Sequence, residues 1–140
     1  MTPDAEAQGI ALGARGMARV VLGPVSAGHL SVRLEGRHIE ASDVVPLEPS
    51  LPAFFRELDR MWRGWDGEQR WTSAGDGCTI RARHAGLGHI SLIVSLREPG
   101  QDREPVSETW EASLGIWLEP ADLPAIADGL DRYLAHDGVA

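Results

Sequence analysis

Residues 69–118 alternate apolar with polar side chains over most of their length, and this period of two constrains the fold more than any other feature of the chain. Such alternation is typical of strands that bury one face of a sheet. The first two strands, over 69–73 and 78–84, flank a four-residue turn. If they pair across that turn, Trp71 lies opposite Ile80 and both side chains face inward. The spacing therefore predicts an antiparallel hairpin with one buried face.

The alternation continues through two further strands. A strand over 90–96 carries an apolar side chain at every second residue. A polar loop over 98–105 precedes a long strand over 106–118. The inward side chains expected for this long strand are Trp110, Ala112, Leu114, Ile116 and Leu118. Because most connections between the strands are short turns, we expect the strands to pair mainly antiparallel.

Shorter strands precede this region. An apolar run over 17–22 ends at a Gly-Pro turn, and a strand over 29–34 alternates in the same way as the later strands. Gly36 is interpreted as part of a two-residue hairpin turn. That turn would place Val32 opposite Ile39 on the buried face.

Two segments show the apolar period of an amphipathic helix. The first begins at Ser50, interpreted as its N-cap, and ends near Gly64. Its apolar stripe consists of Leu51, Phe54, Phe55, Leu58, Met61, Trp62 and Trp65. The stripe of the second helix consists of Leu123, Ile126, Ala127, Leu130, Tyr133 and Leu134. Acidic residues off this second stripe, interpreted as a solvated face, are Asp122, Asp128 and Asp131.

The order of elements is three strands, a helix, four strands and a second helix. The sequence therefore predicts an α+β fold, with a mainly antiparallel twisted sheet of about six to seven strands and two amphipathic helices packed on one face. The other face of the sheet would remain open to water or to a partner. Residues 1–16 show no apolar period and are interpreted as a flexible N-terminal tail, and 17–137 as a single domain.

The composition limits the classes of partner and the compartment. The 140 residues carry a net charge of −8, which opposes binding to nucleic acid or to an anionic membrane. Cys78 is the only cysteine, so an internal disulfide is impossible and a reducing, cytoplasmic location is expected. The sequence shows no signal-peptide pattern and no apolar run long enough to span a bilayer.

Aromatic and thiol side chains suggest two candidate chemistries. Trp62, Trp65 and Trp71 could form an aromatic ligand cage, but their positions on a helical stripe and an inner strand face favour a role in the core. Cys78 begins a strand and faces inward, so a buried apolar role is favoured over a nucleophilic one. The sequence contains no phosphate-binding loop, nucleophile elbow or zinc-protease motif. No catalytic residue and no cofactor are predicted.

A histidine pair, His84 and His89, flanks the turn between two of the strands. A metal site would need both side chains on the same face of the sheet. Pairing Ala82 with Ile90, and therefore Arg83 with His89, keeps the apolar residues on one face. This register sends the two histidines to opposite faces, so no metal site is predicted.

Several segments are distinctive in their order. Residues 62–67 read Trp-Arg-Gly-Trp-Asp-Gly, and 71–73 read Trp-Thr-Ser. Residues 88–97 begin with Gly-His-Ile-Ser-Leu and end with Leu-Arg, and Trp110 follows a short loop later. This order resembles a family of small actinobacterial proteins of unknown function built around a Trp-Arg-Gly-Trp element. The resemblance covers roughly 30–134 and supports the fold above, and because the family has no assigned activity it implies no catalytic residue.

The open face of the predicted sheet is the one surface that suggests a function. By alternation it carries arginine, histidine and glutamate beside an exposed tryptophan, a mixture used in protein recognition, whereas the alternative is an ordinary solvated face. The candidate partner-binding residues are Arg33, His38, Arg81, Arg83, His89, Glu111 and Trp117. Further residues expected on this face are Glu40, Ser91, Ile93, Thr109 and Ser113.

We therefore expect a non-catalytic binding module, with a protein as its partner and an immunity-like or regulatory role. The alternative is a small-ligand-binding protein with a pocket between the sheet and the helices. An enzyme with residues scattered over the open face is a third class. An exposed apolar patch would favour the first class, an enclosed pocket the second, and shifted pKa values in a cleft the third.

Overall fold

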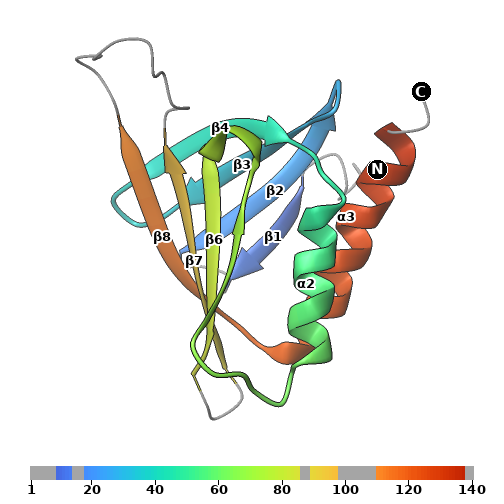
Figure 1. Cartoon of the computed structure of the whole chain (residues 1–140). Coiled ribbons are helices and arrows are strands. Elements are labelled where there is room, and N and C mark those ends of the chain that lie inside the picture. The colour runs from blue at the N-terminus through green and yellow to red at the C-terminus, as the bar shows by residue number, and fades with distance from the viewer. Residues whose placement is uncertain (1–8, 14–17, 86–88, 98–109, 138–140) are drawn as a thin grey trace, which may run out of the picture.

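The computed structural model describes residues 9–13, 18–85, 89–97 and 110–137, and Figure 1 shows the course of the chain. These residues form strands, two α-helices and two short 3₁₀ turns. In chain order the elements are β1 (Ile10–Gly13), β2 (Arg19–Ser26), β3 (His29–Glu35), β4 (Glu40–Pro46), α2 (Ser50–Arg60), β5 (Glu68–Thr72), η1 (Ala74–Asp76), β6 (Cys78–His84), β7 (Ile90–Arg97), β8 (Glu111–Leu118), η2 (Pro120–Asp122) and α3 (Leu123–Asp137).

The α+β class is confirmed, but the strands form two four-stranded antiparallel sheets in place of the single predicted sheet. β1–β4 follow one another in the first sheet, and β5–β8 do so in the second. The helix α2 separates β4 from β5, and these two strands do not pair. Strands of the first sheet contact β7 and β8 of the second, and the apolar faces of both sheets enclose one core together with the helices. Figure 1 shows the strands of the first sheet crossing behind those of the second.

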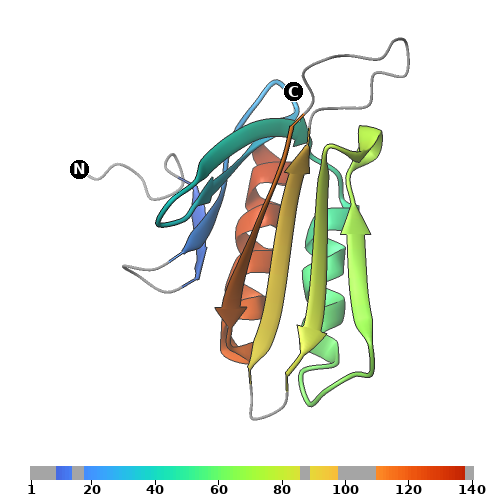
Figure 2. The ribbon, with the colours of Figure 1, turned by 90° about the vertical axis from the view of Figure 1, so that its left-hand side faces the viewer.

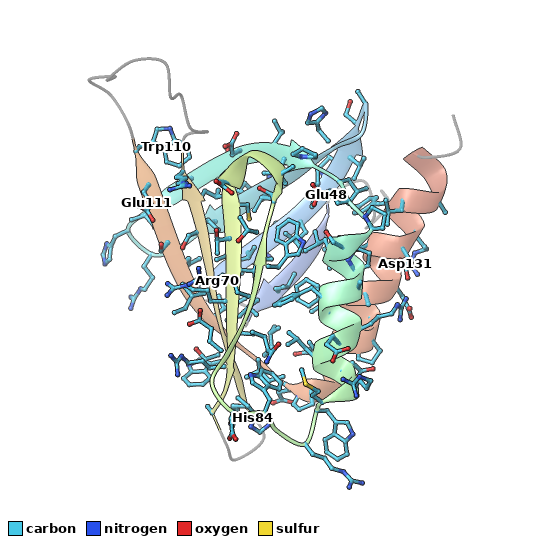
Figure 3. All side chains as sticks on the ribbon, in the orientation of Figure 1. Glu48, Arg70, His84, Trp110, Glu111 and Asp131 are labelled. Carbon is cyan, nitrogen blue, oxygen red and sulfur yellow. The ribbon has the colours of Figure 1, made fainter. Side chains whose placement is uncertain are left out.

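Both helices lie on the same side of the second sheet. Figure 2 shows α2 and α3 behind β5–β8, with β1–β4 leaning away to one side. Arg56 of α2 forms ion pairs with Asp128, at 3.0 Å, and with Asp131 of α3, which Figure 3 labels. These aspartates, interpreted from the sequence as a solvated face, are partly exposed but also connect the two helices. The second sheet therefore has one covered face and one open face.

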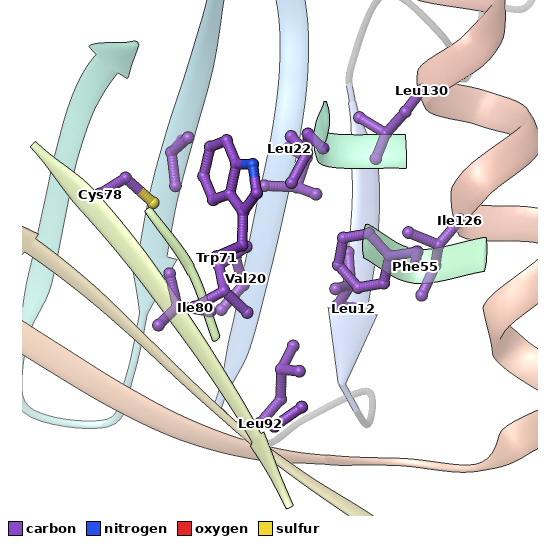
Figure 4. Close-up of a cluster of buried hydrophobic side chains, with 14 of the residues drawn as sticks. Leu12, Val20, Leu22, Phe55, Trp71, Cys78, Ile80, Leu92, Ile126 and Leu130 are labelled. Carbon is purple, nitrogen blue, oxygen red and sulfur yellow. The ribbon is translucent and has the colours of Figure 1, made fainter. Parts of the chain in front are cut away.

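One core connects the two sheets and the helices. Trp71 of β5 lies opposite Ile80 of β6, as predicted, and only 6% of its surface is exposed. Figure 4 draws Trp71 in one cluster with Leu22 of the first sheet and Phe55 of α2. The indole Nε1 of Trp71 donates a hydrogen bond to Ser50 Oγ at 2.9 Å. The core role predicted for Trp71 is confirmed.

β7 and β8 follow the predicted alternation where the structure describes them. β7 buries Ile90, Leu92, Val94 and Leu96. β8 buries Ile116 and Leu118, but Trp110, which precedes the strand, is 41% exposed. The inward position predicted for Trp110 is therefore wrong. The loop predicted over 98–105 and the strand residues predicted over 106–109 lie outside the described residues.

The hairpin between β3 and β4 has a different register from the predicted one. Val32 lies opposite Asp43, because residues 36–39 form a four-residue loop in place of a two-residue turn. A hydrogen bond from the Gly36 amide to the Ile39 carbonyl, 2.9 Å long, closes this loop. Both registers keep the apolar residues of β3 on one face, so alternation could not distinguish them. Ile39 is consequently 42% exposed and not part of the core.

Residues Ile10–Gly13 form a strand, although they lie within the segment 1–16 that was expected to be a flexible tail. β1 pairs antiparallel with β2, which sets Leu12 opposite Val20, and both side chains are buried. Four residues are too few to show a hydrophobic period. Only the partner strand reveals this element.

The helix α2 is shorter than its apolar stripe suggested. It ends at Arg60, so Trp62 and Trp65 lie beyond it. Trp62 is 50% exposed, and the core role predicted for it is wrong, whereas Trp65 is half-buried against the core. The N-cap is Pro49 and not Ser50, whose hydroxyl is hydrogen-bonded elsewhere.

Candidate functional site

The open side of β5–β8, called the outer face from here on, arranges its side chains in rows that cross the four strands. The strand registers define three rows. The hydroxyl row contains Thr72, Thr79, Ser95 and Ser113. The next row contains Arg70, Arg81, Ile93 and Gly115, and the third contains Glu68, Arg83, Ser91 and Trp117. Because side chains alternate along a strand, these residues point away from the core on the opposite face.

The second row places two arginines directly opposite each other. Arg70 of β5 pairs in register with Arg81 of β6, and like charges in this relation repel. Glu68 lies 3.3 Å from Arg70 and 3.8 Å from Arg83, so it offsets part of the positive charge. In the part of the chain that the structure describes, no carboxylate forms an ion pair with Arg81. The outer face therefore concentrates positive charge on a chain whose net charge is −8.

A hollow of about 470 Å³ lies over the hydroxyl row. Besides the four hydroxyl side chains, its lining comprises Arg70, Arg81, Arg97, Asp76 and Glu111. Figure 3 labels Arg70 and Glu111, which come from the two edge strands of the sheet. Arg97 Nε donates to the Asp76 carbonyl at 2.9 Å, and its guanidinium lies 3.6 Å from the Asp76 carboxylate. The turn η1 thus brings an acidic group to the rim of an arginine-rich hollow.

Aromatic side chains occupy another part of the outer face. Trp117 of β8 is 61% exposed, and the His89 ring packs edge-to-face against it with 6.0 Å between ring centroids. These two residues, with Glu119 and Asp122, also border a hollow of about 510 Å³. A large apolar side chain left in water is typical of the anchors that dominate protein interfaces.

The structure divides the predicted partner-binding residues between the two sheets. Those on the outer face are Arg81, Arg83, Glu111 and Trp117, with His89 beside them. Arg33 instead lies on β3, where its Nε is 2.7 Å from Glu35, and His38 lies in the loop after β3. The prediction that all of them share one face was wrong for Arg33 and His38, because it assumed a single sheet. Thr109 lies outside the described residues.

His84 and His89 point to opposite faces of the second sheet, although the register differs from the predicted one. Ala82 pairs with Leu92, two residues from its predicted partner. His84 therefore lies on the inner side, where it packs against Trp65 with 5.3 Å between ring centroids. Among the described residues, no group of three or more histidine, cysteine, aspartate or glutamate side chains could hold a metal ion.

Cys78 is buried in the core, as its strand position predicted. Burial, together with the nearby negative charge of Asp43, raises the pKa of the Cys78 thiol to about 12. A thiol that remains protonated is a poor nucleophile, because the thiolate is the reactive form. The surroundings of Cys78 therefore favour a packing role over a catalytic one.

Sequence reasoning missed several residues of the hollow. They are Arg70, Thr72, Thr79, Ser95 and Arg97. The alternation that places Trp71 inward also places its two neighbours outward, so this signal was present in the sequence. No such signal exists for Asp76, because the turn η1, and not strand alternation, carries it to the rim.

A family model described as "Family of unknown function (DUF6228)" matches residues 19–137. The chain belongs to this family. The match extends from β2 to the end of α3, so the outer face of this DUF6228 chain lies within the region that defines the family. The resemblance to a family of unknown function, noted from the sequence, is thereby confirmed.

Two further comparisons identify no protein similar to this DUF6228 chain. Comparison with curated proteins finds no match, and comparison with solved structures finds none. Within the described residues of this DUF6228 chain, neither helix has the length and apolar character needed to cross a membrane.

Proposed function

We propose that this DUF6228 chain is a non-catalytic binding module that recognises a partner protein through the outer face of β5–β8. One combination supports the proposal: Trp117, 61% exposed, shares a sheet face with Arg81, which has no ion pair among the described residues. Tryptophan and arginine are among the residue types most enriched in the side chains that dominate interface energetics. Their shared face is the best candidate surface for a partner.

The class of partner follows from charge. The net charge of −8 repels nucleic acid and anionic membranes as long-range partners. A protein partner can instead present a small complementary surface to the arginines without approaching the acidic remainder of the molecule. A regulatory or immunity-like role is consistent with such a binding surface. We propose in addition that the protein is bacterial and works in the cytoplasm, as the sequence led us to expect. The single, buried cysteine is compatible with a reducing compartment.

A ligand pocket between the sheet and the helices remains a prediction. Buried core side chains occupy much of the space there, among them Phe55, Leu92 and Ile126. A hollow bordered by β1, β8 and α3 measures about 220 Å³, which is smaller than the roughly 300–1,000 Å³ of a typical ligand pocket. The outer face therefore has the stronger support.

The test compares two exposed tryptophans. A partner captured by the parent protein is produced separately and titrated by calorimetry against Trp117→Ala and against the control Trp62→Ala. Trp62 is similarly exposed but lies beyond the end of α2, away from the outer face. We expect Trp117→Ala to weaken binding by roughly 30-fold or more, since truncation of a tryptophan anchor costs about 2 kcal/mol or more.

Trp62→Ala should bind within about twofold of the parent protein, because energetic anchors lie inside an interface. Full binding by Trp117→Ala would contradict the proposal. A larger loss from Trp62→Ala would move the interface to the other side of the molecule.

A further inference from the structure

We infer that the arginine and hydroxyl hollow on the outer face is a carboxylate-binding site, built to accept an acidic segment of the partner protein. The inference rests on the proposed function, because it names the chemistry that the outer face would recognise. The site comprises Arg70, Arg81 and the four hydroxyl side chains, with Arg97 at the rim.

Arg70 and Arg81 lie directly opposite each other on β5 and β6. Two like charges directly across an antiparallel pair destabilise the sheet. Glu68 lies near Arg70 but forms no ion pair with Arg81 among the described residues. An anion between the two guanidinium groups would replace this repulsion with two attractions. The arrangement is unfavourable for the isolated chain and favourable for a complex.

The hollow is also rich in hydrogen-bond donors, which come from its arginine and hydroxyl side chains. A guanidinium group presents several N–H donors in a planar fork that matches the geometry of a carboxylate. The hydroxyl row adds donors beside the arginines, and Ser95 and Ser113 already share a hydrogen bond of 2.7 Å across β7 and β8. In such a pair the hydroxyl that accepts the hydrogen bond keeps its own O–H hydrogen, which can donate to a ligand carboxylate. The hollow of about 470 Å³ is large enough for an acidic side chain.

The charge of the hollow favours a carboxylate over a phosphate group. Three arginines and two acids line it, Arg70, Arg81 and Arg97 against Asp76 and Glu111, so the lining carries a net charge of +1. A carboxylate carries one negative charge, whereas a phosphate monoester carries roughly −1.5 to −2 at neutral pH. The two acids would repel the additional charge of a phosphate. The lining therefore matches a single carboxylate best.

The experiment uses the full chain labelled with ¹⁵N and a blocked tetra-glutamate peptide as the probe. Spectra are recorded at 0.15 M salt, where charges more than about 8 Å apart are largely screened. We expect the Nε–H signals of Arg70 and Arg81 to shift with a saturable dependence on peptide concentration. Arg81→Gln should weaken peptide binding by about 5- to 10-fold, because charge-assisted hydrogen bonds are the strong ones.

The matched control is Arg83→Gln. Arg83 lies on the same strand and face as Arg81 and carries the same charge, but it does not line the hollow. We expect Arg83→Gln to weaken binding by less than about twofold, because charges outside the site are screened. Equal losses in the two variants would overturn the site in favour of diffuse attraction. Tighter binding of inorganic phosphate than of the peptide would also overturn it.

A second variant separates this inference from the proposed function. The tetra-glutamate peptide has no apolar anchor, so Trp117→Ala should bind it as the parent protein does. If the peptide does not bind while Trp117→Ala still loses the partner, the carboxylate site is wrong and the outer face remains an interface. If the peptide binds but the partner binds Trp117→Ala as tightly as it binds the parent protein, the interface proposal is wrong.

Discussion

The two sheets differ in whether their outward-facing arginines pair with a carboxylate of the same sheet. On β1–β4, Arg19 and Arg33 each donate a hydrogen bond of 2.7 Å to Glu35. On β5–β8, Arg70 and Arg81 face each other, and the latter has no ion pair among the described residues. The first sheet satisfies its positive charges internally, whereas the second sheet leaves positive charge available for another molecule.

The Glu35 carboxylate, which pairs with both arginines of the first sheet, shows the effect of this pairing in its pKa. Hydrogen bonds from Arg19 and then Arg33 lower the pKa of Glu35 from its ordinary value. Both sheets carry arginines on antiparallel strands, so residue type alone does not mark a binding site. The distinguishing feature is whether the fold itself supplies the counter-charge.

The largest expected effect concerns the core that the two sheets share. Trp71→Ala should lower the free energy of unfolding by roughly 3–5 kcal/mol, because it removes a large buried side chain and leaves a cavity. Chemical denaturation followed by circular dichroism measures this loss. Hydrogen exchange of amides in β3 and β6 should show both sheets opening together. Loss of protection in β6 alone would show that the two sheets do not share one cooperative core.

An intermediate effect concerns the paired arginines of the first sheet. Glu35→Gln should destabilise the protein by about 0.5–1 kcal/mol at pH 7, a value reduced by solvent screening of these partly exposed groups. Because the pKa of Glu35 is lowered in the folded state, its contribution is present above the unfolded pKa and is lost as pH falls through the folded pKa. The difference between parent and variant should therefore shrink below about pH 4.3.

Glu40→Gln is the matched control for this measurement. Glu40 lies opposite Glu35 on the neighbouring strand, and replacing it with glutamine removes the same negative charge. It should cause no loss of stability, since it removes a like-charge neighbour. Equal losses in the two variants would mean that the pairing around Glu35 contributes nothing specific.

The smallest expected effect concerns the opposed arginines of the second sheet. Arg81→Gln should leave stability unchanged or raise it by up to about 0.5 kcal/mol, because it removes a repulsion and breaks no ion pair among the described residues. Arg19→Gln, the equivalent change on the first sheet, should lower stability. Thermal melts of both variants at low salt measure the contrast. A clear loss from Arg81→Gln would show that Arg81 is structural and would weaken its assignment to a binding site.

Much of the local structure could be read from the chain. Alternation identified Trp71 and Ile80 as a buried cross-strand pair, and the helical stripe identified the buried face of α3. Alternation also placed Arg81 and Arg83 outward. These inferences succeed because side-chain direction within one element depends only on backbone geometry.

Other features depended on which segments meet. The pairing of Val32 with Asp43 could not be inferred, because two registers of the same parity bury the same residues. The pairing of β1 with β2 could not be inferred either, because a four-residue strand shows no hydrophobic period. The same reason explains the error over Arg33, which alternation correctly turned outward but on a different sheet from Arg81.

Local patterning was thus sufficient to say which way most residues of β5–β8 point, since alternation is a property of the extended backbone itself. The folded chain was needed to say what stands beside it. The division into two sheets, the meeting of Arg70 with Arg81, and the arrival of Asp76 at the rim of the hollow all depend on contacts between elements. The energy of a charge pair depends on the distance between its members. An arginine beside Glu35 is therefore neutralised, whereas an arginine on the outer face without a nearby carboxylate stays available to a ligand.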